Sequence, residues 1–183
     1  MCCRLCTLVT WGCSVSRLAP INFMGWINDN RHLLKPPVGN KLIWEDRDVI
    51  VMVVGGPNSR TDYHVNGGEE FFYQVEGDIT LKVFDDGKHQ DIVIKQGEIF
   101  LLPASVPHSP RRPANTVGLV IEQKRQEGEQ DGFIWFCENC GEKLYEEHFT
   151  LTNIATQFPP IFERFYASEN TLCKKCGTKV VKP

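Results

Sequence analysis

Short apolar segments dominate the middle of the chain, and turn-forming residues separate them. Gly, Pro, Asn or Asp recurs about every 8–12 residues between Asn40 and Ile121. The segments that this pattern predicts as strands are 41–45, 48–55, 70–76, 78–85, 89–94, 98–102 and 116–123. Many short strands with frequent turns are typical of an all-β sandwich or barrel.

The residues before this region predict helical structure. The spacing of apolar positions over 21–34 favours a short amphipathic helix or two turns. Lys35-Pro36-Pro37 should end it, because proline lacks an amide hydrogen and clashes with a preceding helical turn.

The residues after the strand-rich region form a second kind of sequence. A polar linker over 123–132 precedes a predicted strand, turn and strand, and 150–169 predicts one or two helices. Pro159 and Pro160 suit a break between two helices, since proline is tolerated in a first turn. We therefore expect three parts: a poorly ordered extension (1–19), a β-barrel (20–123) and a C-terminal metal-binding extension with helices (124–183).

Composition narrows the class of protein. The chain has 183 residues, of which 42% are hydrophobic and 23% charged, as in an ordinary globular domain. A net charge of −3 gives no reason to expect a nucleic-acid partner. No apolar run reaches the roughly 18–20 residues that a membrane span needs, so we expect no membrane partner. Residues 1–19 make a poor secretory signal and favour a disordered extension, or a start codon placed too early.

Two of the five histidines stand in an informative context. Gly56 is followed after five residues by Asp62-Tyr63-His64, and Glu70 and Gly77 come later. A second segment places Gly97, Pro103, Ser105 and His108 at matching intervals. These two segments resemble the paired motifs of the cupin superfamily, which implies a double-stranded β-helix barrel.

The chain departs from the cupin motifs in ways that bear on its chemistry. Asp62 replaces the first histidine of the HxH motif, and the spacer before Glu70 is slightly long. The remaining candidates, His64, Glu70 and His108, are the two histidines and one carboxylate of non-heme Fe(II) oxygenases. Glu69 competes with Glu70 for the ligand role, although the spacing to Gly77 favours Glu70. A degenerate barrel without metal is the alternative.

Charged residues near these candidates indicate an anionic substrate. Arg60 precedes His64 by four residues, and Arg112 follows His108 by four. A guanidinium group matches a carboxylate in bidentate fashion. Asp62 is either a partner of a ligand or arginine, or only a turn residue.

The longer motifs are more specific than the cupin pattern. RTDYH with EEFFYQ, then IFLLPASVPHSPRRP and LVIE, closely resemble the 3-hydroxyanthranilate 3,4-dioxygenase family, and NFMGWI and PPVGN also fit. The resemblance covers about residues 20–183 and includes the cysteine pairs of the bacterial and fungal form.

The resemblance implies an activity and a set of roles. The activity is cleavage of 3-hydroxyanthranilate with O2 to 2-amino-3-carboxymuconate semialdehyde, on the kynurenine route from tryptophan to quinolinate and NAD. His64, Glu70 and His108 would bind Fe(II), and Arg60 and Arg112 would hold the substrate carboxylate. Glu122 would contact the substrate and handle a proton, and Asn40 would shape the loop over the site. The family also implies a homodimer paired through its sheet.

Cysteines predict a second metal site. Cys137-Glu-Asn-Cys140-Gly and Cys173-Lys-Lys-Cys176-Gly form two CxxCG turns at the C-terminal end. Four thiolates at this spacing favour a tetrahedral zinc or iron site in a reducing compartment, such as the cytoplasm. The residues alone leave zinc and iron open; the resemblance favours a rubredoxin-like iron with a structural role. Cys2, Cys3, Cys6 and Cys13 have no interpretable spacing.

Two other functions remain possible at this point. One is a cupin dioxygenase that acts on a different aminophenol or a catechol. The other is a non-catalytic cupin that senses an aromatic acid.

Overall fold

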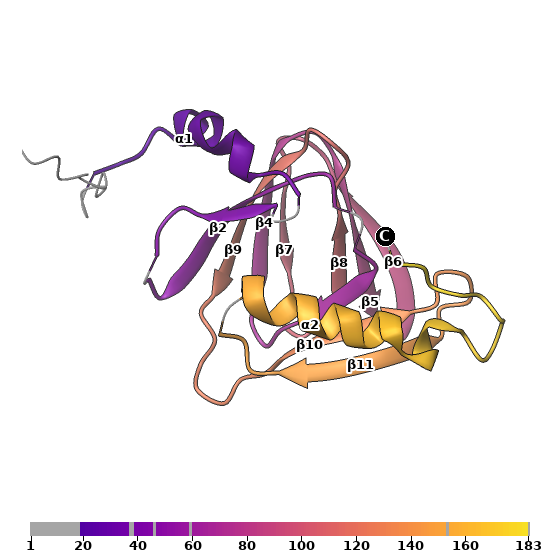
Figure 1. Ribbon diagram of the computed structural model, residues 1–183. Helices are drawn as coiled ribbons and strands as arrows, with labels where there is room; N and C mark the ends of the chain where they lie inside the picture. The colour runs from indigo at the N-terminus through magenta and orange to yellow at the C-terminus, as the bar shows by residue number, and fades with distance from the viewer. Residues whose placement is uncertain (1–18, 37–38, 46, 59, 153, 183) are drawn as a thin grey trace, which may run out of the picture.

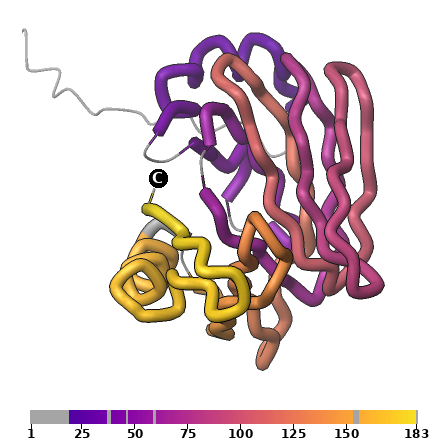
Figure 2. The backbone as a smooth tube through the Cα atoms, turned by 90° about the vertical axis from the view of Figure 1, so that its right-hand side faces the viewer, coloured from indigo at the N-terminus to yellow at the C-terminus, as the bar shows by residue number. Residues whose placement is uncertain are grey.

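A computed structural model describes residues 19–36, 39–45, 47–58, 60–152 and 154–182. The cysteines expected in a disordered extension lie outside the described residues. Two antiparallel sheets face each other, and the helices lie at their periphery (Figures 1 and 2). The predicted all-β barrel with a few short helices is thus confirmed.

The sheets contain all eleven strands of the described part of the chain. The first sheet has the order β1 (Asn40–Leu42), β2 (Val49–Gly55), β9 (Val117–Gln123), β4 (Glu70–Glu76) and β7 (Ile99–Leu102). The second has the order β11 (Lys143–Phe149), β10 (Asp131–Phe136), β3 (Asp62–Val65), β8 (His108–Arg111), β5 (Ile79–Asp85) and β6 (Lys88–Ile94). The helices are α1 (Phe23–Asn30) and α2 (Ile154–Ala167), with 3-10 turns at Arg31–Leu33 and Glu169–Thr171.

The main core fills the space between the sheets. Alternate residues of β4 and β5 are buried, as expected of strands that present one face to a core. The buried apolar residues that form this core are Met52, Phe72, Ile79, Leu81, Val83, Ile94, Leu102 and Val120. They occupy the body of the barrel and leave one end to polar side chains.

Two strands escaped prediction from the sequence. β3 and β8 are four residues each, and their sequences DYHV and HSPR are mostly polar or contain proline. They lack the apolar alternation that marks a strand. Both strands carry predicted metal ligands. These polar residues interrupt the apolar pattern from which a strand is predicted.

The C-terminal part joins the barrel through its sheet. β10 pairs with β3 over four residue positions, so the second sheet continues past residue 124. The division at residue 124 stays a prediction, but the sheet crosses it. Every residue of β10 is buried. Phe133 and Trp135 pack against α2 on one face, and Ile134 and Phe136 pack with Tyr63 on the other.

The helix break expected at Pro159 and Pro160 is absent, because α2 runs through both residues. Proline within a helix costs about 3 kcal/mol. The apolar face of α2 offsets this cost through a cluster of buried aromatic side chains. Phe158 and Phe165 pack on Phe133 and Trp135 of β10, and the rings of Trp135 and Phe165 stack at 4.4 Å.

Phe165 tests how firmly α2 is held. Its side chain is fully buried, so Phe165→Ala should lower the free energy of unfolding by about 3–5 kcal/mol. Leu172→Ala is the control, since this side chain is half exposed and should change stability by less than about 0.5 kcal/mol. Chemical denaturation measures both, and equal effects would contradict the packing described here.

Candidate metal centre and substrate pocket

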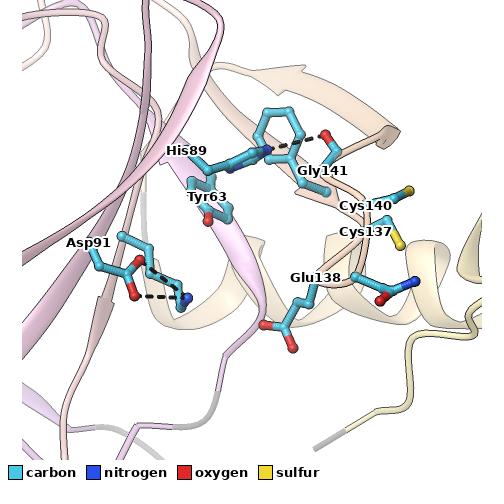
Figure 3. Close-up of a pocket in the computed structure, with 10 residues that line it drawn as sticks. Tyr63, His89, Asp91, Cys137, Glu138, Cys140 and Gly141 are labelled. Atoms are coloured by element: carbon cyan, nitrogen blue, oxygen red, sulfur yellow. Dashed lines mark hydrogen bonds and ion pairs between the residues drawn. The ribbon is translucent and has the colours of Figure 1, made fainter.

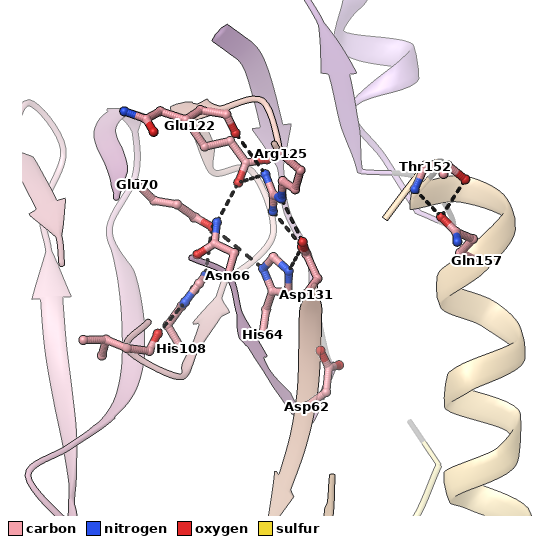
Figure 4. A network of polar contacts seen from close by, with 12 residues as sticks. Asp62, His64, Asn66, Glu70, His108, Glu122, Arg125, Asp131, Thr152 and Gln157 are labelled. Carbon is pink, nitrogen blue, oxygen red and sulfur yellow. Dashed lines mark hydrogen bonds and ion pairs between the residues drawn. The ribbon is translucent and has the colours of Figure 1, made fainter. Parts of the chain in front are cut away.

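Three polar side chains converge at the open end of the barrel. His64 of β3 lies directly opposite His108 of β8, so both rings project to the same side, with their centroids 5.4 Å apart. Glu70, the first residue of β4, reaches between them from the facing sheet (Figure 4). One Glu70 oxygen lies 3.8 Å from His64 Nδ1 and 3.3 Å from His108 Nε2. Glu69 is exposed, so Glu70 is the carboxylate that faces the histidines.

In each imidazole one nitrogen is hydrogen-bonded to the protein, and the other faces Glu70 and can bind a metal. His108 Nδ1 donates to the carbonyl oxygen of Val106 at 3.0 Å, which leaves Nε2 toward Glu70. His64 Nε2 donates to Asp131 Oδ2 at 2.6 Å, which leaves Nδ1 toward Glu70. The ligand atoms of the three residues all lie within 4.8 Å of one another. Their geometry therefore fits a single metal ion bound on one side.

Ionisation of the three residues also suits a metal. Burial lowers the pKa of His64, which keeps its ring neutral and its lone pair available. Burial alone would raise the pKa of Glu70, but the charge of His108 and its hydrogen bond to Glu70 are the main causes that lower it to about 2. For His108, attraction to Glu70 outweighs burial and raises the pKa. A bound cation would take the place of that proton.

A cavity of about 110 Å³ lies beside the triad. It is far smaller than the roughly 300–1,000 Å³ of a site for a drug-sized ligand, so it suits a small molecule. The lining side chains come from both sheets and from the C-terminal segment. They include every residue predicted for the catalytic site except His108: Asn40, Arg60, His64, Glu70, Arg112 and Glu122.

Arg112 is the buried positive charge of this cavity. Its side chain is 2% exposed, and among the described residues no carboxylate forms an ion pair with it. One Nη1–H donates to Gln74 at 3.3 Å, and Nε, although buried, has no hydrogen-bond partner. Burial lowers the pKa of Arg112 to about 10, so the group is still charged at neutral pH. Unused donors on a buried cation favour an anionic ligand.

Gly118 provides the space for this guanidinium group. A Cβ at this position would lie 2.8 Å from Arg112 Nη1 and 2.9 Å from Gln74 Oε1. Both distances are shorter than real Cβ contacts allow, so any larger residue here would displace the end of Arg112 or Gln74. The sequence did not single out Gly118, because the reason for it lies across the sheet.

Glu122 lies next to the triad on β9. It is opposite Glu70 in the sheet, and Asn66 Nδ2 donates to both carboxylates at 3.1 Å. Burial and the nearby charge of Glu70 raise the pKa of Glu122 to about 7, although Arg125 opposes the shift. Glu122 can therefore exist in either protonation state near neutral pH, as a proton carrier requires. Sequence reasoning missed Asn66 and Arg125.

Arg60 is held at the cavity edge by Asp62. The buried Asp62 carboxylate accepts from Nε at 2.9 Å and from Nη2, which settles Asp62 as a partner of arginine. The guanidinium carbon also lies 5.0–5.5 Å from the ring centroids of Phe133, Phe158 and Phe162. These aromatic faces attract the cation.

The four predicted cysteines meet at the C-terminal end. Sγ of Cys137 lies 3.5 Å from that of Cys176, and Sγ of Cys140 lies 3.6 Å from that of Cys173. Tetrahedral ligands about 2.3 Å from zinc would place sulfurs about 3.8 Å apart, so the cluster fits a four-thiolate metal site. Gly141 and Gly177 have φ near +73° and +75°, which is why glycine follows each cysteine pair.

A larger cavity of about 290 Å³ lies between this cluster and the barrel (Figure 3). Two of its polar side chains already have partners: Lys82 pairs with Asp91 at 3.3 Å, and His89 donates to the Gly141 carbonyl at 3.2 Å. We assign no chemistry to it, despite its size, because it lies away from the histidine–carboxylate group.

Comparisons with known proteins agree with this geometry. The family model described as 3-hydroxyanthranilic acid dioxygenase matches residues 15–166. Proteins named 3-hydroxyanthranilate 3,4-dioxygenase are similar to this chain. The one from Xanthomonas euvesicatoria is 56% identical, covering 87% of this chain and 91% of its own length. The one from Jannaschia sp. is 53% identical, covering 89% and 92%.

Among solved structures, a cupin-2 domain containing protein from Shewanella frigidimarina is similar over 57% of this chain and 94% of its own. The identity is 25% and the TM-score 0.46.

The metal assignment can be tested by direct binding. His64→Ala, Glu70→Ala and His108→Ala should each weaken Fe(II) binding at least 100-fold, because two ligands cannot replace three. Glu69→Ala is a matched control from the same loop and should bind normally, since this side chain is exposed. Calorimetric titration of Fe(II) into protein whose cysteine site is already filled, and whose triad is free of metal, gives the affinities. Normal binding by His108→Ala would rule out the assignment.

The cysteine site should hold its own metal. Cys173→Ser should reduce the metal content by one equivalent and lower the thermal midpoint, because the four thiolates join the two ends of the C-terminal segment. Elemental analysis and thermal unfolding measure both effects. Unchanged metal content would show that the thiols are free.

Proposed function

The chain belongs to the 3-hydroxyanthranilic acid dioxygenase family, and we propose that it opens the ring of 3-hydroxyanthranilate with O2 to give 2-amino-3-carboxymuconate semialdehyde. The observation that carries the choice of substrate is Arg112. It is a buried cation with unused donors beside a group of two histidines and one carboxylate. An aromatic acid that also chelates a metal would use both features.

We propose that His64, Glu70 and His108 hold Fe(II), and that the four cysteines hold a second iron with a structural role. Bound at the triad, Fe(II) would bring the aromatic substrate and O2 together and accept electron density from the ring. The three residues approach from one side and so leave positions for both reactants. Their committed nitrogens fix the direction of each free lone pair.

Arg112 would bind the substrate carboxylate through the donors that the protein leaves unused. Arg60 would face the same carboxylate from the cavity edge, with Asp62 and the aromatic rings limiting its movement. Because Arg112 is already buried, binding does not require it to lose water at that moment. Asn40 lines the cavity on β1 and would limit the position of the ring.

Glu122 would accept a proton from the hydroxyl or amino group of the substrate. It lies within the same cavity, and Asn66 holds it at a fixed distance from Glu70. The apolar lining, which includes Met52, Phe72 and Val120, would exclude water from the reacting atoms.

We further propose a homodimer and a cytoplasmic location. β7 is an edge strand whose Ile99 and Leu101 are 65% and 53% exposed, which suits pairing with a second copy. The four cysteines of the C-terminal site form no disulfide, and a thiolate metal site suits a reducing compartment. None of the helices in the described part of the chain has the length and apolar character to span a membrane.

The carboxylate contact predicts a selective kinetic defect. Arg112→Gln should raise the KM for 3-hydroxyanthranilate about 10- to 100-fold, the value of a lost charge-assisted hydrogen-bond pair. 2-Aminophenol lacks the carboxylate, so its KM should change little in the same variant. Oxygen-uptake kinetics on Fe(II)-loaded protein measure both.

The neighbouring arginine is the control. Arg111 pairs with the exposed Glu138 at 3.1 Å, so Arg111→Gln should leave both KM values near those of the unsubstituted protein. If Arg112→Gln raised the KM values of both substrates equally, the substrate carboxylate would bind somewhere other than Arg112. An Fe(II)-loaded protein that binds 3-hydroxyanthranilate without consuming O2 would instead indicate a sensor.

A further inference from the structure

We infer that Asp131 and Arg125 are positioning residues, which fix the ring of His64 for metal binding and link it to Glu122. The inference rests on the proposed iron centre. Both residues lie within the segment that the sequence presented only as a polar linker, and neither is one of the three candidate metal ligands. Their role follows from a continuous series of hydrogen bonds and ion pairs (Figure 4).

Asp131 is the member of this series that contacts His64. It lies two residues before Phe133, which is opposite His64 in the sheet, so Asp131 and His64 lie on the same face. The Asp131 side chain is fully buried and accepts from His64 Nε2 at 2.6 Å. This contact requires hydrogen on Nε2 and therefore a lone pair on Nδ1, the nitrogen that faces Glu70.

Arg125 keeps Asp131 in place. Its Nε and Nη2 donate to the two carboxylate oxygens of Asp131 at 2.8 and 2.7 Å. Its Nη1 lies 2.9 Å from Glu122 Oε2. One guanidinium group thus orients the carboxylate behind a metal ligand and the carboxylate in the substrate cavity.

The series returns to the triad through a second path. Glu122 shares Asn66 with Glu70, so two of the three metal ligands connect through Asp131, Arg125, Glu122 and Asn66. A residue that only stabilised the fold would not need to meet a metal ligand at the nitrogen opposite its free lone pair. Carboxylates behind metal-bound histidines typically account for 10- to 100-fold in metal affinity.

The test uses Asp131→Asn in the full-length chain. This substitution keeps the size of the side chain but offers Arg125 an amide in place of a carboxylate. We expect 10- to 100-fold weaker Fe(II) binding, measured by competition with a chromogenic chelator. We also expect a shifted visible spectrum when Co(II) occupies the triad. Asp91→Asn is the control, because Asp91 is an exposed carboxylate that pairs with Lys82.

A structural role gives a different result. Fe(II) affinity within twofold of the unsubstituted protein, with an unchanged Co(II) spectrum, would overturn the inference even if Asp131→Asn lowers the thermal midpoint. If Asp131→Asn does not fold, Arg125→Lys serves, since it keeps the charge and loses the bidentate contact. Unchanged affinity in Arg125→Lys would likewise overturn it.

The outcomes separate this inference from the proposed function. Unsubstituted protein that binds Fe(II) but does not consume O2 with 3-hydroxyanthranilate would refute the function and leave the positioning role intact. Normal turnover in the unsubstituted protein, with normal metal binding in Asp131→Asn, would do the reverse.

Discussion

The structure depends most on one buried carboxylate between two imidazoles. Glu70 is 5% exposed, and burial of a charge without compensation is costly. The register of β3 and β8 supplies the compensation, because it places His64 opposite His108 and turns both rings toward Glu70. Without a bound cation, the charge of Glu70 is balanced by a proton on His108. A metal ion would balance the charge of Glu70 in place of that proton.

The polar groups around this carboxylate divide into two kinds. Asp62 with Arg60, and Asp131 with Arg125, are ion pairs whose members already satisfy each other. Arg112 is different, because its donors are buried and incompletely used. The two ion pairs therefore orient side chains around the site, and Arg112 is the cation that stays available to the substrate. This contrast is the structural reason to expect an acidic substrate.

The C-terminal segment contributes to the site as well as to the fold. β10 carries Asp131 at one end and Phe133 near its middle, and α2 places Phe158 against the ring of His64. Cys173 and Cys176 follow α2 along the chain, and they meet Cys137 and Cys140, which follow β10. A metal there would stabilise the same helix that covers the substrate pocket.

The sequence predicted the features that depend on residues close together in the chain. Short apolar segments between turn-forming residues located β4, β5 and β9, and motif spacing selected Glu70 over its neighbour Glu69. β3 and β8 were missed because their polar and proline residues conceal the strand pattern. Asp131 could not be found, because its partner His64 lies 67 residues away and a single aspartate in a polar segment carries no pattern. The helix break at Pro159 was wrong because packing against β10 overrode local preference.

Isotope labelling tests the central claim most directly. Fe(II)-loaded protein should convert 3-hydroxyanthranilate under ¹⁸O₂ to a ring-opened product with one labelled atom in the new carboxylate and one in the aldehyde. Immediate chemical reduction of the aldehyde prevents exchange of its oxygen with water before mass spectrometry. Incorporation of both atoms is the result that the proposed ring cleavage predicts. A product without label, or no product from fully Fe(II)-loaded protein, would contradict it.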